Sequence, residues 1–91
     1  MDAGALFQAA IARRQKQDVE AAVDSIDLAA KAAPNHPQIA AVRAQLYYES
    51  WRPASALFAE AAALNPGDLQ LLRNQALALT SEGAGGAAQA L

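Results

Sequence analysis

The feature that most constrains this chain is a spacing of small, bulky and helix-breaking residues that occurs twice. Alanine is followed by a bulky residue four positions on, by alanine three further on, and by proline five further on. The two copies are Ala22, Ile26, Ala29 and Pro34, then Ala54, Phe58, Ala61 and Pro66. A sequence period of this size is typical of stacked supersecondary units that bury their apolar faces against one another. The repeat therefore predicts a stacked array and not a single globular core.

Apolar periodicity and end signals divide the chain into five expected helices, at about 3–16, 18–33, 38–49, 53–64 and 69–81. Asp18 is the expected N-cap of the second helix. Pro34 closes that helix, and Pro37 suits the first turn of the next one. The pattern predicts an all-α fold.

The turns and the C-terminal region carry further predictions. Trp51, in the short turn 50–53, is expected to fold back over a helix pair as an amphipathic lid. Three glycines within 83–86 predict a flexible turn over 82–86, because each glycine costs roughly 1 kcal/mol inside a helix. Residues 87–91 then resemble the start of a sixth helix. The fifth expected helix carries one apolar stripe: Leu69, Leu72, Ala76 and Leu79.

Charge and composition argue against several classes of partner. The net charge is -2 and the pI is near 5.1, so no overall basic field attracts nucleic acid or an anionic membrane. The chain has no cysteine, which removes thiolate chemistry and cysteine-based zinc sites. An acid follows Met1 where a secretory signal carries bases, and no apolar run approaches about 18 residues. A soluble, cytoplasmic protein is expected.

The sequence shows no arrangement that indicates catalysis or metal binding. His36 is the single histidine, so a transition-metal site would need carboxylates alone to complete it. Residues 83–86 lack the preceding strand and the following Lys-Ser/Thr of a phosphate loop. Glu20, Asp24 and Asp27 form an acidic edge, which we interpret as solvated or balanced by basic residues of a neighbouring helix. We expect no enzymatic activity, no cofactor and no metal.

The repeated spacing resembles the second-helix signature of tetratricopeptide repeats (TPRs). Ala10 and Ala44 match the small site of the first helix, and Tyr47 matches its tyrosine site. The third unit offers Leu72, Ala76, Leu79, Gly83 and Ala88 at the family spacing. The chain departs from the family pattern at Arg13, where tyrosine is preferred, and at 17–19, where a glycine-containing turn is usual. The interval from Tyr47 to Ala54 is also two residues shorter than the standard.

The resemblance implies an α-solenoid of antiparallel helix-turn-helix repeats in a right-handed superhelix, spanning residues 1–91. The units are about 3–34, 37–66 and 69–91, the last one incomplete. Members of the family bind peptides or proteins along a concave surface lined by the first helix of each pair. The family's groove positions fall here on Phe7, Ile11, Arg14, Gln38, Ala41, Gln45, Tyr48, Arg73, Asn74 and Leu77.

The expected partner is a protein or peptide, and neither a nucleic acid nor a membrane. Members of the family that grip a terminal carboxylate use Lys, Asn and Arg in the groove. Phe7, Ile11 and Ala41 occupy positions where those polar groups would be needed, so no such clamp is expected. Two alternatives stay open: the non-catalytic N-terminal arm of a larger enzyme, and a module that self-associates through the exposed face of its terminal repeat.

Overall fold

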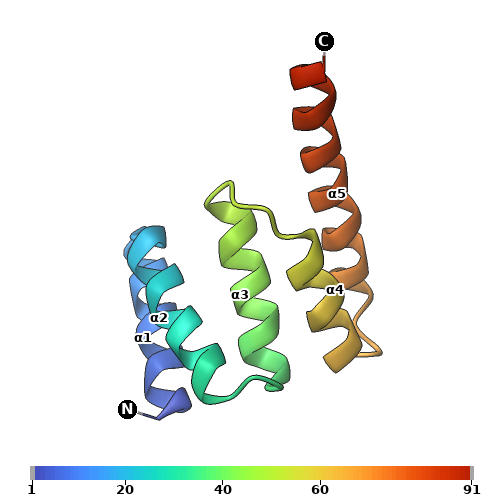
Figure 1. Cartoon of the computed structure of the whole chain (residues 1–91). Helices are drawn as coiled ribbons and strands as arrows, with labels where there is room; N and C mark the ends of the chain where they lie inside the picture. The colour runs from blue at the N-terminus through green and yellow to red at the C-terminus, as the bar shows by residue number, and fades with distance from the viewer. Residues whose placement is uncertain (1, 91) are drawn as a thin grey trace.

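The computed structural model describes the backbone of residues 2–90 and the side chains of residues 2–81. Over this range the chain forms five α-helices and no strand: α1 (Ala3–Gln15), α2 (Val19–Ala32), α3 (Pro37–Glu49), α4 (Ser55–Leu64) and α5 (Leu69–Ala90). The predicted all-α class is confirmed. Consecutive helices run antiparallel, and each packs mainly against the helices that precede and follow it (Figure 1). The molecule measures 46 × 29 × 20 Å along its principal axes.

The repeated residues form the core. Ile26 and Phe58 are fully buried, and so are the small residues of the repeat that flank them: Ala22, Ala29, Ala54 and Ala61. Ile26 belongs to a cluster built by α1, α2 and α3, and Phe58 to a second cluster built by α3, α4 and α5. Helix α3 serves both, with Ile39 and Leu46 in the first cluster and Ala44 in the second. The chain therefore buries its apolar residues in two adjoining clusters that meet at α3.

Two turns repeat as closely as the core does. Gln17 and Trp51 lie 34 residues apart, and both have a φ of 63°, in the left-handed region that favours glycine. Each follows the end of a helix with the same pair of backbone hydrogen bonds. The pairs run from Gln17 N–H to Arg14 O and Asp18 N–H to Arg13 O, and from Trp51 N–H to Tyr48 O and Arg52 N–H to Tyr47 O. This pattern is the Schellman motif, formed here without glycine.

The second unit then departs from the first by losing a helical turn. Ala22 is the fourth residue of α2, whereas its counterpart Ala54 is the N-cap of α4. Helix α4 accordingly has 10 residues where α2 has 14. Its start at Ser55 falls two residues after the predicted start at Pro53. The shorter interval between Tyr47 and Ala54 thus shortens α4 at its beginning.

Helix ends elsewhere follow the expected signals. Asp18 caps α2, because its side chain accepts a hydrogen bond from the N–H of Ala21 at 3.2 Å. Pro37 is the first residue of α3, as predicted. His36 caps α3 through Nδ1, which accepts from the N–H of Ile39 at 3.4 Å. That role was missed because histidine is not among the residues that usually cap helices.

The predicted turn over 82–86 is wrong. Helix α5 runs without interruption to Ala90, so residues 87–90 are its end and not the start of a sixth helix. Leu91 lies outside the described residues. A glycine lowers helix stability without forbidding the helix, and each further residue adds a backbone hydrogen bond once the helix has formed. No proline interrupts the segment, and alanine, the best helix former, surrounds the glycines.

The predicted lid over the helix pair is also wrong, because the side chain of Trp51 is 91% exposed. The backbone of this residue is fixed by the Schellman motif, and its counterpart Gln17 is likewise exposed. A side chain at this position of the turn projects into solvent in both units. Over residues 2–90, no helix has the combined length and apolar content that crossing a membrane requires.

Candidate functional site

A chain of hydrogen-bonded polar side chains crosses the molecule from α1 to α5, and we call it the polar ladder: Arg14, Glu49, Gln45, Asn74 and Gln70. It begins with Arg14 of α1, whose Nε donates to Oε1 of Glu49 at 3.1 Å. Arg14 Nη2 donates to the other carboxylate oxygen. Such two-point contacts between arginine and a carboxylate are strong and geometrically specific.

The ladder continues from α3 to α5. Gln45 Nε2 donates to Glu49 Oε2 at 3.2 Å, and Gln45 Oε1 accepts from Asn74 Nδ2 at 3.3 Å. Asn74 Oδ1 accepts in turn from Gln70 Nε2 at 3.2 Å. The three predicted residues Arg14, Gln45 and Asn74 are therefore brought together on one surface. That surface is formed by the first helix of each predicted unit.

Two members of the ladder were missed by sequence reasoning. Glu49 lies one helical turn after Gln45, and Gln70 lies one turn before Asn74. Polar residues four apart on a helix interact regularly, so this spacing could have identified both. The ion pair of Glu49 with Arg14 spans 35 residues and has no local signal.

The other predicted groove residues surround the ladder without joining it. Phe7 is partly buried against the first cluster, and Ala41 against the second. Ile11 is half-buried. The half-buried ring of Tyr48 stands edge-on to Phe58, with 6.2 Å between ring centroids. Gln38, Arg73 and Leu77 are exposed, and within residues 2–81 neither Gln38 nor Arg73 makes a side-chain hydrogen bond or ion pair.

A second set of polar side chains holds α2 against α3 and is centred on Tyr47. Its hydroxyl donates to the carboxylate of Asp27 at 3.0 Å, and Arg43 Nε donates to the same carboxylate at 2.9 Å. The guanidinium carbons of Arg43 and Arg52 lie 5.4 and 5.9 Å from the centre of the Tyr47 ring, within the range of cation–π attraction. We call Tyr47 and its partners the tyrosine cluster: Asp27, Arg43, Arg52 and Glu20.

The tyrosine cluster balances the acidic edge of α2 with basic side chains from the next unit. Arg52 Nη2 donates to Glu20 Oε2 at 2.6 Å. This hydrogen bond lowers the pKa of Glu20 and raises the pKa of Arg52. Burial alone would lower the pKa of Arg43, but the hydrogen bond to Asp27, the charge of that carboxylate and the contact with Tyr47 together raise the pKa. These charges hold the two units together, which is a structural role.

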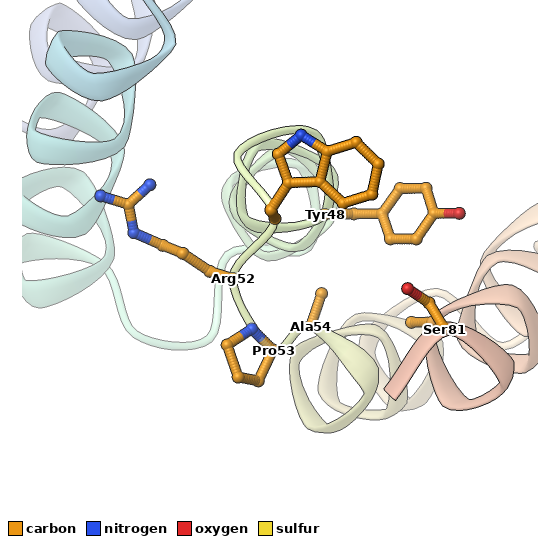
Figure 2. Close-up of a pocket in the computed structure, with 7 residues that line it drawn as sticks. Tyr48, Arg52, Pro53, Ala54 and Ser81 are labelled. Carbon is orange, nitrogen blue, oxygen red and sulfur yellow. The ribbon is translucent and has the colours of Figure 1, made fainter. Parts of the chain in front are cut away.

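A pocket of about 140 Å³ lies where the first turn of α4 is missing (Figure 2). We call it the turn pocket. It is lined by Tyr48, Trp51, Arg52, Pro53, Ala54, Ala78 and Ser81. Figure 2 shows the side chain of Arg52 pointing away from the pocket, toward the partner that it has on α2. The pocket is thus bounded by aromatic, small apolar and hydroxyl-bearing residues.

The described residues hold no group of three or more His, Asp or Glu side chains placed to bind a metal ion. The surface formed by α1, α3 and α5 combines neutral polar side chains with Arg14, Arg73 and the carboxylate of Glu49. Comparison of the chain with protein-family models, curated proteins and solved structures finds no match.

Proposed function

We propose that this chain is a protein-interaction module of the TPR type, which binds a peptide or a helix along the surface formed by α1, α3 and α5. The polar ladder is the observation that carries the proposal. The proposal includes the right-handed solenoid arrangement of the helices. That arrangement is supported by the repeated core around Ile26 and Phe58 and by the repeated turns at Gln17 and Trp51.

The ladder suits a binding surface because its side chains are held in place before a ligand arrives. Preorganised groups lose less conformational entropy on binding, so more of the interaction energy remains as affinity. Half-buried Ile11 and Tyr48 and exposed Leu77 supply apolar contacts around it. Arg73, which has no ion-pair partner among the side chains of residues 2–81, supplies a cation, and aromatic and arginine residues are the usual anchors of interfaces.

The proposal includes no catalytic step and no cofactor, and the partner is a polypeptide. The cytoplasm stays the compartment that the sequence predicts. A role as the non-catalytic arm of a larger enzyme is compatible with the proposal, but no contact described above favours it.

The test is selection of binding peptides from a random displayed library, followed by calorimetry on the double variant Arg73→Ala/Leu77→Ala. The matched control is Lys31→Ala/Leu28→Ala on α2, because Leu28 and Leu77 are 51% and 49% exposed. We expect the α5 variant to lose at least tenfold in affinity, with the control unchanged and both variants fully helical. Equal affinities for the two variants would refute the proposed surface.

A second candidate function, self-association, is favoured by the apolar stripe of α5. Leu69 is 75% exposed, and Leu72 and Leu79 are exposed as well, whereas Leu71 and Ala78 on the opposite side of the helix are buried. Clustered exposed leucines mark interaction surfaces more often than scattered ones do. Light scattering of the wild type and of Leu72→Asp/Leu79→Asp tests this, since only the wild type should form dimers. A monomeric wild type at millimolar concentration would exclude self-association.

A further inference from the structure

The turn pocket exists because the second unit is shorter than the first. Four residues separate Gln17 from Ala22, and three of them belong to the first turn of α2. Only Arg52 and Pro53 separate Trp51 from the equivalent Ala54. Helix α4 therefore starts late, and the space of its missing turn stays open between α3, α4 and α5.

Trp51 at the rim of the turn pocket is unfavourable for stability on two counts. A left-handed backbone is unfavourable for a residue other than glycine. The indole does not recover that cost by packing, because it is 91% exposed. The backbone conformation is shared with Gln17 and belongs to the turn, whereas the exposed indole is particular to the second unit. Tryptophan is enriched among residues that dominate binding energy. A ligand that covers the ring accounts for its exposure at the rim of the turn pocket.

The lining of the turn pocket defines the chemistry of its ligand. Pro53, Ala54 and Ala78 supply an apolar surface, and Tyr48 and Trp51 supply aromatic rings. Over the described side chains, the indole N–H of Trp51 and the hydroxyls of Tyr48 and Ser81 are free to donate hydrogen bonds. Among the described residues of the lining, the charged one is Arg52, which is engaged by Glu20 and Tyr47. The ligand is therefore uncharged, apolar and rich in hydrogen-bond acceptors.

We propose that the turn pocket binds a proline-rich peptide segment in the polyproline II conformation. Such a segment has carbonyl groups without internal hydrogen bonds, and its prolines have no N–H to satisfy. Its rings pack on aromatic side chains, and its carbonyls accept from the indole and hydroxyl donors. A cavity of about 150 Å³ holds one benzene molecule, so a pocket of about 140 Å³ holds one pyrrolidine ring.

The other common modes of peptide recognition fit the turn pocket less well. Strand addition needs an exposed sheet edge, and residues 2–90 contain no strand. Docking of an amphipathic helix needs a groove with successive apolar positions one turn apart, whereas the turn pocket is a single small compartment. The described lining presents aromatic rings and hydrogen-bond donors, which is the arrangement that recognises proline-rich segments.

The single tryptophan of the chain makes this proposal directly testable. Titration of the ¹⁵N-labelled protein with a decaproline peptide is expected to shift the indole N–H resonance of Trp51 saturably. Trp51→Gly is expected to weaken binding at least tenfold by calorimetry while leaving the protein as stable as the wild type or more so, because glycine suits the left-handed position. Gln17→Gly is the matched control, since it makes the same backbone change 34 residues earlier and should leave decaproline binding unchanged.

Three results would overturn the proposal. The first is wild-type affinity in Trp51→Gly. The second is an equal indole shift with a ten-residue Gly-Ser peptide, which would show binding without selectivity for proline. The third is loss of decaproline binding in Arg73→Ala/Leu77→Ala, which would place the peptide on the surface of α1, α3 and α5. The turn pocket shares Tyr48 with that surface but does not depend on it, so either proposal can fail alone.

Discussion

The alternation of alanine with one bulky residue determines how the helices of this protein meet. Ile26 and Phe58 each fill the space between neighbouring helices, and the alanines on either side of them allow the close approach. Interiors of this kind are packed at near-crystalline density, so the surroundings relax only partly when a large side chain is removed. The bulky residue of each repeat is therefore the one whose loss costs most.

Phe58→Ala tests this placement. We expect the free energy of unfolding to fall by about 3–5 kcal/mol, because the ring is fully buried between α3, α4 and α5. Urea denaturation followed by circular dichroism measures the change. Leu28→Ala, at a half-exposed leucine, is the control and should change stability by roughly 0.5 kcal/mol or less. A loss below about 1 kcal/mol at Phe58 would show that the packed face is misplaced.

Sequence patterns predict buried residues better than they predict turn residues in this chain. The burial of Ile26 and Phe58 follows from periodicity, which depends only on neighbours along one helix. The position of Trp51 depends on a Schellman motif that usually announces itself by glycine, and both such motifs here lack it. A large aromatic residue in a turn was therefore assigned to packing, although its backbone directs it into solvent.

At the level of helices, the lengths of α4 and α5 differ from expectation in opposite directions. Helix α4 is shorter than α2, since two residues are missing before Ala54 and the two that remain, Arg52 and Pro53, are not helical. Helix α5 is longer than predicted, since three glycines weaken it without ending it. Predicted ends near prolines and capping residues fall within two residues of the observed ones, whereas the end predicted from glycine alone fails.

The triple substitution Gly83→Ala/Gly85→Ala/Gly86→Ala tests the extension of α5. In a helix each change should be stabilising, by up to about 1 kcal/mol, and the helical signal in far-ultraviolet circular dichroism should rise. Gly67→Ala, in the turn between α4 and α5, is the control and should leave helix content unchanged. A lower helix content in the triple variant would favour a turn at 82–86.

The polar ladder could be predicted only in part. Arg14, Gln45 and Asn74 follow from the register of three helices, which the repeat supplies. The pairing of Arg14 with Glu49 and of Asn74 with Gln45 depends on the spacing between helices 29 to 35 residues apart in the chain. No local pattern encodes that spacing. The sequence therefore predicts which residues share a surface, but not the contacts between them.

Across the whole molecule, the tyrosine cluster is the main polar link between the first two units. It joins Glu20 and Asp27 of α2 to Arg43 and Tyr47 of α3 and to Arg52 of the following turn. Exposed ion pairs contribute little individually, and Glu20 is largely exposed. The contribution of the ion pair between Glu20 and Arg52 to stability can nevertheless be measured through its dependence on pH.

Glu20→Gln measures that contribution. The pKa of Glu20 is lower in the folded protein than its ordinary value of 4.5, so its ion pair with Arg52 stabilises the protein above that pH. We expect the variant to be less stable than the wild type at pH 6 and equal to it in acid, as pH falls below 4.5 through the folded pKa. Urea denaturation at low ionic strength across this range tests the trend, with exposed Glu60→Gln as control. A stability difference that does not vary with pH would contradict this assignment.

The polar ladder also limits which shapes the molecule can adopt. Its side chains reach across three helices, and the bond that joins α3 to α5, from Asn74 Nδ2 to Gln45 Oε1, is 3.3 Å long, near the upper end of the usual range. Pulling α1, α3 and α5 apart would therefore rupture the link between Asn74 and Gln45 almost at once, whereas a small inward movement would shorten it. The hydrogen bond between Asn74 and Gln45 therefore limits how far α3 and α5 can separate before the polar ladder is broken.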